Sequence, residues 1–331
     1  MKVSIIIPVY KAANYIELCI KSIMNQTYQD IECFLVNDVS PDDSIAIAER
    51  LIANYKGPVQ FHILNHEQNS GPAVARNTGI SAATGDYICF MDSDDEITPD
   101  CIEKLAQPIL KDPTIEMVEG CYTIVSIDKN NIIIEKPISR PQLEFTSRKA
   151  VRDFYFSRQY ENILPWNKLV SKNFLLKKQL YFREIRTGED NLWHFHYFQH
   201  LSHFYTIPDI TYKYYTRQNS ITTTPHKDYR NRNAPLYAEI AQSLSPDDSV
   251  REVKHFLKGF CLFYLGGPAY PIYTQTANQF LKVLKDNHCT KDWLFLESIV
   301  ILSKFEPARK FIKKAGETLK KFKNSSKVVK S

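Results

Sequence analysis

Three carboxylates lie within four residues at Asp92-Ser93-Asp94-Asp95, directly after the apolar run 87–91. Neighbouring carboxylates repel one another unless a cation lies between them. A short acidic turn suits Mg²⁺ or Mn²⁺, which bind one or two carboxylates and complete their shell with water and substrate phosphates. The competing interpretation is that the aspartates cap a helix near Asp100, although Thr98, before Pro99, is already placed as its N-cap. The turn therefore indicates a divalent-metal site, with helix capping as the alternative.

Alternating strand-like and helix-like runs in the first 125 residues predict the elements that position this turn. Apolar runs rich in β-branched and aromatic residues predict strands over 3–7, 31–36, 59–64 and 87–91. Between them, helical patterns cover 16–24, 44–55 and 73–83, and a further helix is expected from Thr98. Strands and helices that alternate with short connections predict an α/β fold, a mostly parallel sheet with helices on both faces.

Polar side chains follow the other predicted strands as well. Pro8-Val9-Tyr10 comes after the first strand, and Asn37-Asp38 comes after the second. In an open parallel sheet, ligands bind beyond the carboxyl ends of the strands. We therefore expect the Tyr10 ring, the Asp38 carboxylate and the acidic turn to meet in one crevice.

The rest of the chain has a different pattern. Two strand-like runs in 116–138 flank Asp128-Lys129-Asn130-Asn131, which predicts a β-hairpin. The chain is aromatic-rich and irregular after 148, and mostly helical beyond about 230. A chain of 331 residues exceeds the size at which one core stops growing, so two unequal lobes are expected.

Composition narrows the class of protein. No apolar stretch reaches the ~20 residues of a membrane span, and the opening residues show no signal-peptide cleavage pattern, so we expect a cytoplasmic protein. Seven dispersed cysteines predict reduced, buried thiols. The net charge of +5 divides into +8 on residues 301–331 and −3 elsewhere, which argues against a nucleic-acid partner. The dinucleotide fingerprint, the P-loop and the G-x-S-x-G elbow are absent from the sequence.

Five blocks of sequence, in order, resemble the family 2 glycosyltransferases, which have the Rossmann-like GT-A fold. The blocks span residues 3–10, 22–28, 35–40, 71–77 and 85–95, and weaker matches follow at 165–169, 188–190 and 214–220. The resemblance implies inverting transfer of a hexosyl or N-acetylhexosaminyl group. The donor would be a nucleotide-diphospho-sugar, most simply a UDP-sugar, and the acceptor a hydroxyl of a glycan or lipid, as in bacterial surface-polysaccharide synthesis. It divides the chain into a donor-binding half (1–110), an acceptor-binding half with the catalytic base (111–225), and a mainly helical extension with a basic tail (226–331).

The resemblance also implies roles for single residues. Pro8 and Tyr10 would frame the base, Asp38 would hydrogen-bond it, and Arg76 would face the nucleotide. Asp92 and Ser93 would contact the ribose and metal region, and Asp94, with Asp92, would bind Mn²⁺ or Mg²⁺.

Asp190 would be the catalytic base, since transfer needs one carboxylate to take the proton of the attacking hydroxyl. Glu189 would orient Asp190 or act in its place, and Gly188 permits a tight approach. The competing interpretation is a pair of acidic residues in the first turn of a helix. The sequence has Val39 where the family has Gly, and a β-branched residue resists positive φ, so the loop after Asp38 is expected to differ.

Several other features have structural and functional interpretations. His194, His196 and His200 could hold a metal or approach the diphosphate, and Trp166 and Trp193 could contact the acceptor, although most aromatic residues are expected in the core. The segment 305–325 has the pattern of a basic amphipathic helix, which favours a peripheral contact with the inner face of the cytoplasmic membrane. The rival functions are a sugar-phosphate nucleotidyltransferase and a non-catalytic nucleotide-sugar-binding protein.

Overall fold

The computed structural model describes residues 1–127, 133–155, 164–185 and 188–216, together with short helical stretches between 239 and 294. The chain forms two compact units, residues 1–224 and 225–331. The basic tail and most of the predicted helical extension lie outside the described residues, as do Cys261 and Cys289. Within the described residues, no helix has the length and apolar character needed to cross a membrane.

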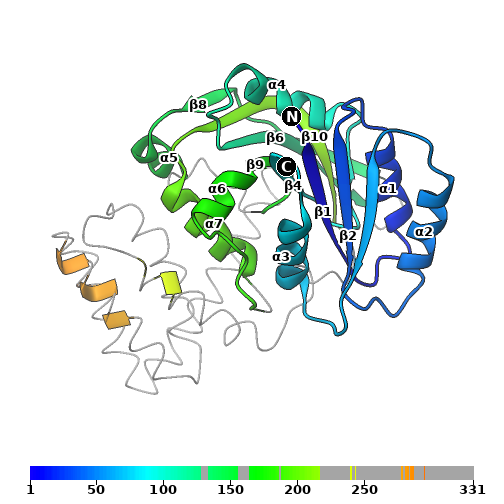
Figure 1. Ribbon diagram of the computed structural model, residues 1–331. Coiled ribbons are helices and arrows are strands. Elements are labelled where there is room, and N and C mark those ends of the chain that lie inside the picture. The colour runs from blue at the N-terminus through cyan, green and yellow to red at the C-terminus, as the bar shows by residue number, and fades with distance from the viewer. Residues whose placement is uncertain are drawn as a thin grey trace. The chain divides into compact units, whose positions relative to one another are not determined.

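A ten-stranded mixed sheet forms the body of the first unit (Figure 1). Its strand order is β3-β2-β1-β4-β9-β6-β10-β5, with β7 paired to β6 and β8 paired to β10. The strands are β1 (Val3–Val9), β2 (Ile31–Asn37), β3 (Gln60–Asn65), β4 (Tyr87–Phe90), β5 (Glu96–Ile97), β6 (Met117–Ile127), β7 (Ile133–Ile138), β8 (Leu143–Phe145), β9 (Lys168–Ser171) and β10 (Phe204–Tyr215). The helices are α1 (Ile16–Met24), α2 (Ser44–Asn54), α3 (Pro72–Ala82), α4 (Cys101–Lys111), α5 (Arg148–Tyr155), α6 (Lys172–Lys177) and α7 (Glu189–His200).

The first four strands are parallel, as their apolar runs predict. β1 pairs with both β2 and β4, and β2 pairs with β3. α1 and α2 lie on one face of this part of the sheet and α3 on the other (Figure 1). α3 packs closely on β1, because a Cβ at Gly79 would lie 2.3 Å from the Ile6 side chain. A strand covered on both faces needs apolar residues on both, which explains the nearly unbroken run of β1.

The second part of the sheet contains pairings that the sequence does not signal. β9 is antiparallel to both β4 and β6, so it joins the parallel strands to the rest of the sheet. The predicted hairpin is confirmed, since β6 and β7 pair antiparallel from Ile127 and Ile133 outward. α4 begins at Cys101 with Asp100 as N-cap, so the prediction of Thr98 as the cap is wrong; the Thr98 hydroxyl donates to Asp100 instead.

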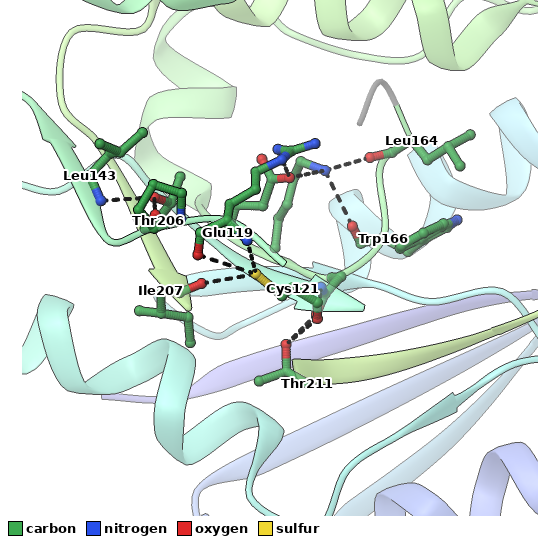
Figure 2. Close-up of polar contacts among 12 residues, drawn as sticks. Glu119, Cys121, Leu143, Leu164, Trp166, Thr206, Ile207 and Thr211 are labelled. Carbon is green, nitrogen blue, oxygen red and sulfur yellow. Dashed lines mark hydrogen bonds and ion pairs between the residues drawn. The ribbon is translucent and has the colours of Figure 1, made fainter. Parts of the chain in front are cut away.

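Buried polar contacts hold β6, β9 and β10 together (Figure 2). Nζ of Lys168 donates to the carbonyl oxygen of Leu164 at 2.7 Å and lies 4.0 Å from Oε1 of Glu119. The carbonyl oxygen of Cys121 accepts a hydrogen bond from Nδ2 of Asn167, which lies beside Lys168, at 2.9 Å. These contacts satisfy polar groups that the core would otherwise leave unpaired. The five cysteines that the structure describes are buried free thiols, as their dispersed spacing predicts.

Candidate active site

The carboxyl ends of β1, β2 and β4 lie along one edge of the sheet. In the parallel register, Val9 of β1 is opposite Asn37 of β2, and Ile6 is opposite Phe90 of β4. The residues that follow these strands therefore lie on the same edge, as the order of the strands predicts.

Arg76 of α3 connects the acidic turn to the first turn of α7. Its Nη2 donates to Oδ1 of Asp92 at 3.1 Å, and its Nη1 donates to Oδ1 of Asp190 at 2.8 Å. Nη1 also lies 3.6 Å from Oε1 of Glu189. The guanidinium is buried and lies over the ring of Phe182, 5.2 Å from its centroid. One arginine thus joins the acidic turn to the Glu189-Asp190 pair, which lies about a hundred residues further along the chain.

The start of α7 explains how Asp190 reaches this position. Gly188 precedes the helix with φ of 82°, a left-handed conformation that side chains resist. Burial raises the pKa of Asp190 to about 7; the charge of Arg76 opposes the rise, and Glu189 and Asp92 add to it. A carboxyl group with a pKa near neutrality is suited to act as a general base at physiological pH.

Asn77, the neighbour of Arg76, fixes the segment that leads toward α7. Its Nδ2 donates to the Phe182 carbonyl oxygen, and its Oδ1 accepts from the Phe182 backbone N–H, both at 2.8 Å. Ring contacts of Phe182 with Phe90 and Trp193 continue this packing into the core. Of these two adjacent residues of α3, Arg76 therefore binds carboxylates and Asn77 binds backbone groups.

The aspartates of the acidic turn have different surroundings. Asp95 is buried, and its carboxylate accepts hydrogen bonds from the Tyr212 hydroxyl at 2.8 Å and the Tyr215 backbone N–H at 2.9 Å. Burial and the charges of Asp92 and Asp94 raise the pKa of Asp95. Asp95 therefore anchors the turn to β10, whereas Asp92 and Asp94 are half-buried.

The donor set of the turn fits a hard divalent cation bound through two carboxylates. Within the described parts of the chain, the three aspartates do not form a group of three converging ligands. A cation at Asp92 and Asp94 would take its remaining ligands from water and phosphate, which is how Mg²⁺ and Mn²⁺ bind in phosphate-transfer sites.

Asp38 organises the loop that precedes α3. Its Oδ1 accepts the Ser70 backbone N–H at 2.8 Å and lies 2.9 Å from Nδ1 of His66, and its Oδ2 accepts the Gly71 backbone N–H at 2.7 Å. Asp38 is buried, and within the described residues its Oδ2 has no second donor, so one lone pair of this oxygen is uncommitted. The partners His66 and Ser70 were not selected from the sequence, because nothing in their spacing points to Asp38.

Val39, which follows Asp38, has φ of 57°, a left-handed conformation. Two side chains hold it there: Oδ1 of Asn37 accepts the Ser40 backbone N–H, and Nδ2 of Asn69 donates to the Asp38 carbonyl oxygen, both at 2.9 Å. A β-branched residue in this region is strained. Val39 therefore adopts the left-handed conformation that its β-branched side chain was expected to resist.

Tyr10 and Pro8 lie at the carboxyl end of β1. The Tyr10 side chain is 45% exposed, and Nζ of Lys11 lies 5.2 Å from its ring centroid. The Lys11 backbone N–H donates to Oγ of Ser40 at 2.8 Å, which joins this loop to the one after Asp38. An exposed aromatic ring beside a basic side chain can stack on a nucleobase.

The predicted contact of two tryptophans with an acceptor is wrong. Trp166 and Trp193 are each 1% exposed. Trp166 stacks on Tyr212, and Trp193 stacks on Phe182 and donates Nε1–H to the Leu180 carbonyl oxygen. Both indoles are core residues.

The histidines of α7 do not form a metal site in the described residues. His194 is fully buried, neither of its ring nitrogens has a hydrogen-bond partner, and burial lowers its pKa. No group of three metal ligands within the described ranges includes His196 or His200. His194 therefore packs as a neutral ring among aromatic residues.

Comparisons with known proteins identify the class and then the family. The chain superposes on the S. aureus TarS 1–349 complex with UDP with a TM-score of 0.68 at 18% identity, covering 96% of this chain and 92% of that one. The TarS complex with UDP-GlcNAc gives a TM-score of 0.63 at 18% identity, over 86% and 81% of the chains. The fold is therefore the α/β GT-A fold.

The family model for "Glycosyl transferase family 2" matches residues 4–167. The uncharacterized glycosyltransferase YibD of Escherichia coli K12 is 30% identical over 237 residues, which are 70% of this chain and 66% of YibD. Glycosyltransferase GlyG of Streptococcus pneumoniae serotype 4 is 28% identical over 226 residues, 67% of this chain and 73% of GlyG. The chain belongs to glycosyltransferase family 2, as its five sequence blocks predict.

Proposed function

We propose that this chain transfers a sugar from a UDP-sugar to an acceptor hydroxyl with inversion at the anomeric carbon. The observation that carries the proposal is the joint binding of Asp92 and Asp190 by Arg76. It brings a carboxyl group with a pKa of about 7 next to the turn suited to a cation. Family membership favours glycosyl transfer over nucleotidyl transfer or simple sugar binding.

Asp190 takes the proton from the acceptor hydroxyl as that oxygen attacks the anomeric carbon. A single displacement needs one base, on the face opposite the leaving group. Arg76 holds the Asp190 carboxylate at 2.8 Å and keeps it oriented in the presence of the like charge of Glu189. The carboxylate of Asp190 is therefore oriented before the acceptor binds.

Asp94 and Asp92 of the acidic turn would hold Mn²⁺ or Mg²⁺. When bound, such a cation neutralises negative charge that develops on the diphosphate leaving group. Around Arg76, three carboxylates face one guanidinium, so the site carries excess negative charge that favours binding of a cation.

Tyr10, Pro8 and Asp38 bind the base of the donor. The exposed Tyr10 ring offers a stacking surface, and the remaining lone pair on Oδ2 of Asp38 can accept an imide N–H, which uracil supplies. The TarS structures contain UDP and UDP-GlcNAc, which supports a UDP-sugar donor and an N-acetylhexosaminyl or hexosyl group.

The acceptor is a glycan or a lipid-linked sugar. The lysine-rich segment 305–325 supports a peripheral contact with an anionic membrane surface on the cytoplasmic side. Deletion of 305–331 should abolish sedimentation with anionic liposomes. Unchanged sedimentation would refute the membrane contact without affecting the proposed chemistry.

The function is tested by measuring UDP release from a panel of UDP-sugars with Mn²⁺ or Mg²⁺, with and without glycan acceptors. We expect one donor to be turned over and a chelator to stop the release. A parallel assay supplies UTP with sugar 1-phosphates and measures pyrophosphate. Pyrophosphate formation without UDP release would support the nucleotidyltransferase, and donor binding without either product would support the non-catalytic protein.

A further inference from the structure

A second cluster of metal-ligating side chains lies outside the proposed active site. It joins Asp112 at the C-terminal end of α4, Glu144 of β8 and His203 between α7 and β10. One ligand atom from each residue lies within 4.8 Å of the other two. None of the three takes part in the contacts of Arg76, so the proposed transfer reaction does not account for the cluster.

The hydrogen bonds around Thr114 fix the tautomer of His203. Oγ1 of Thr114 lies 2.6 Å from Oδ1 of Asp112 and 3.0 Å from Nδ1 of His203. The Thr114 hydroxyl donates to this oxygen of Asp112, as does the Thr114 backbone N–H at 2.9 Å. The single hydroxyl proton therefore points to Asp112, and Nδ1 of His203 must be the donor to Thr114.

This assignment leaves Nε2 of a neutral His203 with a lone pair. Nε2 lies 3.0 Å from Oε1 of Glu144, so two acceptors face each other at hydrogen-bond distance. Such a contact needs a positive centre: a second proton on the ring, or a metal cation bound to both atoms. A donor fixed at Nδ1 with a free Nε2 is the usual arrangement of a metal-ligating histidine.

The surroundings suit a metal. With metal–ligand bonds of about 2.1 Å, two ligands of a tetrahedral ion are about 3.4 Å apart, so the half-exposed Glu144 side chain would move by a few tenths of an ångström to bind it. The His203 backbone is held in place, because Oε2 of Glu116 accepts its N–H at 3.1 Å. Oδ2 of Asp112 accepts no hydrogen bond in the described part of the chain and can act as a ligand.

A cavity of about 380 Å³ adjoins the cluster and is lined by Asp112 and Glu144, with Lys104, Lys111, Tyr205 and Asp209 among its other walls. It provides an entry path and room for the water or anion that would complete the coordination shell. One imidazole with two carboxylates is a ligand set that suits Zn²⁺, with a fourth position left open.

We propose that Asp112, Glu144 and His203 bind one divalent transition-metal ion, best matched by Zn²⁺, which ties β8 to the ends of α4 and α7. With neutral His203, the two carboxylates give the cluster a charge of −2, which the cation neutralises. Because the ligands come from three segments, the ion stabilises the folded chain and not the unfolded one.

The test measures Zn²⁺ binding by titration calorimetry and the Tm of chelator-treated protein, without nucleotide. The Asp94→Asn variant is included so that binding at the acidic turn does not contribute. We expect one Zn²⁺ per chain in both proteins and a rise in Tm of about 5 °C at a hundredfold excess over Kd. Asp209→Asn, which changes a cavity wall but no ligand, is the matched control and should bind as well as the parent.

His203→Gln and Glu144→Gln should each weaken binding by at least tenfold and remove the Zn²⁺-dependent rise in Tm. Since His203→Gln could impair folding, X-ray absorption of the Zn²⁺-loaded parent is a second measurement, and should show one imidazole among oxygen ligands. Unchanged Zn²⁺ affinity in both variants would overturn the proposal. So would a Tm of the parent protein that does not respond to Zn²⁺.

Discussion

Nη1 of Arg76 lies 2.8 Å from Oδ1 of Asp190, although 114 positions separate the two residues in the sequence. The same guanidinium binds Asp92, so the proposed base and the proposed metal turn share one buried partner. This contact converts three separate sequence motifs into one site. It also makes Arg76 the residue whose replacement should affect both stability and the pH dependence of activity.

Replacing Arg76 with Gln should destabilise the fold by about 3 kcal/mol, because one buried and two partly buried carboxylates lose their cationic partner. The charge of Arg76 opposes the rise in the pKa of Asp190, so its removal should also raise that pKa above about 7. Chemical denaturation and the pH profile of activity test the two effects. Arg76→Lys keeps the charge but cannot bind both carboxylates in a fork, so it should shift the pH profile less than Arg76→Gln.

The pH dependence of kcat/KM in the parent enzyme should report the ionisation of Asp190. The proposed base works when deprotonated, so kcat/KM should rise with pH and level off above an apparent pKa of about 7. An unperturbed aspartate would give a plateau from about pH 5 upward. A profile flat between pH 5 and 8 would contradict the assignment of a base with a raised pKa.

The ionisation of Glu32 should make the free energy of unfolding depend on pH in the acidic range. Burial raises its pKa, but hydrogen bonds from Lys2, Ser4 and Thr84 outweigh this and lower it to about 2. A depressed pKa stabilises the fold above the unfolded value of about 4.3, and the contribution is lost as pH falls toward about 2. The shift corresponds to about 3 kcal/mol at neutral pH. Glu32→Gln should remove this pH dependence of the unfolding free energy, whereas Asp30→Asn, at an exposed position beside β2, should retain it.

Val39→Gly should stabilise the chain. The left-handed conformation costs a side-chain-bearing residue about 1–2 kcal/mol, and the added chain entropy of glycine offsets about 0.5–1 kcal/mol of the gain. A net gain of about 0.5–1 kcal/mol in the free energy of unfolding is expected. Val39→Ala retains a Cβ and is the matched control, with a smaller gain. A loss of stability in Val39→Gly would show that the turn is not strained.

The sequence was sufficient to predict the parallel strands and the edge of the sheet on which the residues after β1, β2 and β4 lie. Apolar runs and alternating periods are local signals, and the carboxyl ends of parallel strands must meet. The same reasoning could not predict that β9 is antiparallel between β4 and β6, because that pairing depends on contacts between distant segments. The predicted N-cap of α4 was also wrong, because two nearby polar residues, Thr98 and Asp100, are both suited to that position.

Single residues of the site were harder to assign than the edge on which they lie. Asp95 resembles its neighbours in sequence, but Tyr212, 117 positions away, makes it an anchor of the turn. Trp166 is of a residue type that can contact a sugar, but it stacks on Tyr212 within the core. Tertiary packing decides which partner a polar or aromatic side chain has. Residue type alone cannot predict that partner.

The central claim is that Asp190 is the base and that the acidic turn serves the donor. The most direct measurement compares turnover and donor affinity in Asp190→Asn, Asp94→Asn and Glu189→Gln. Asp190→Asn should lower turnover by at least a hundredfold, with UDP-sugar affinity within a few-fold of the parent. Asp94→Asn should weaken donor binding that depends on metal, and Glu189→Gln should retain measurable turnover. Near-normal turnover in Asp190→Asn, or loss of turnover in Glu189→Gln alone, would contradict the account.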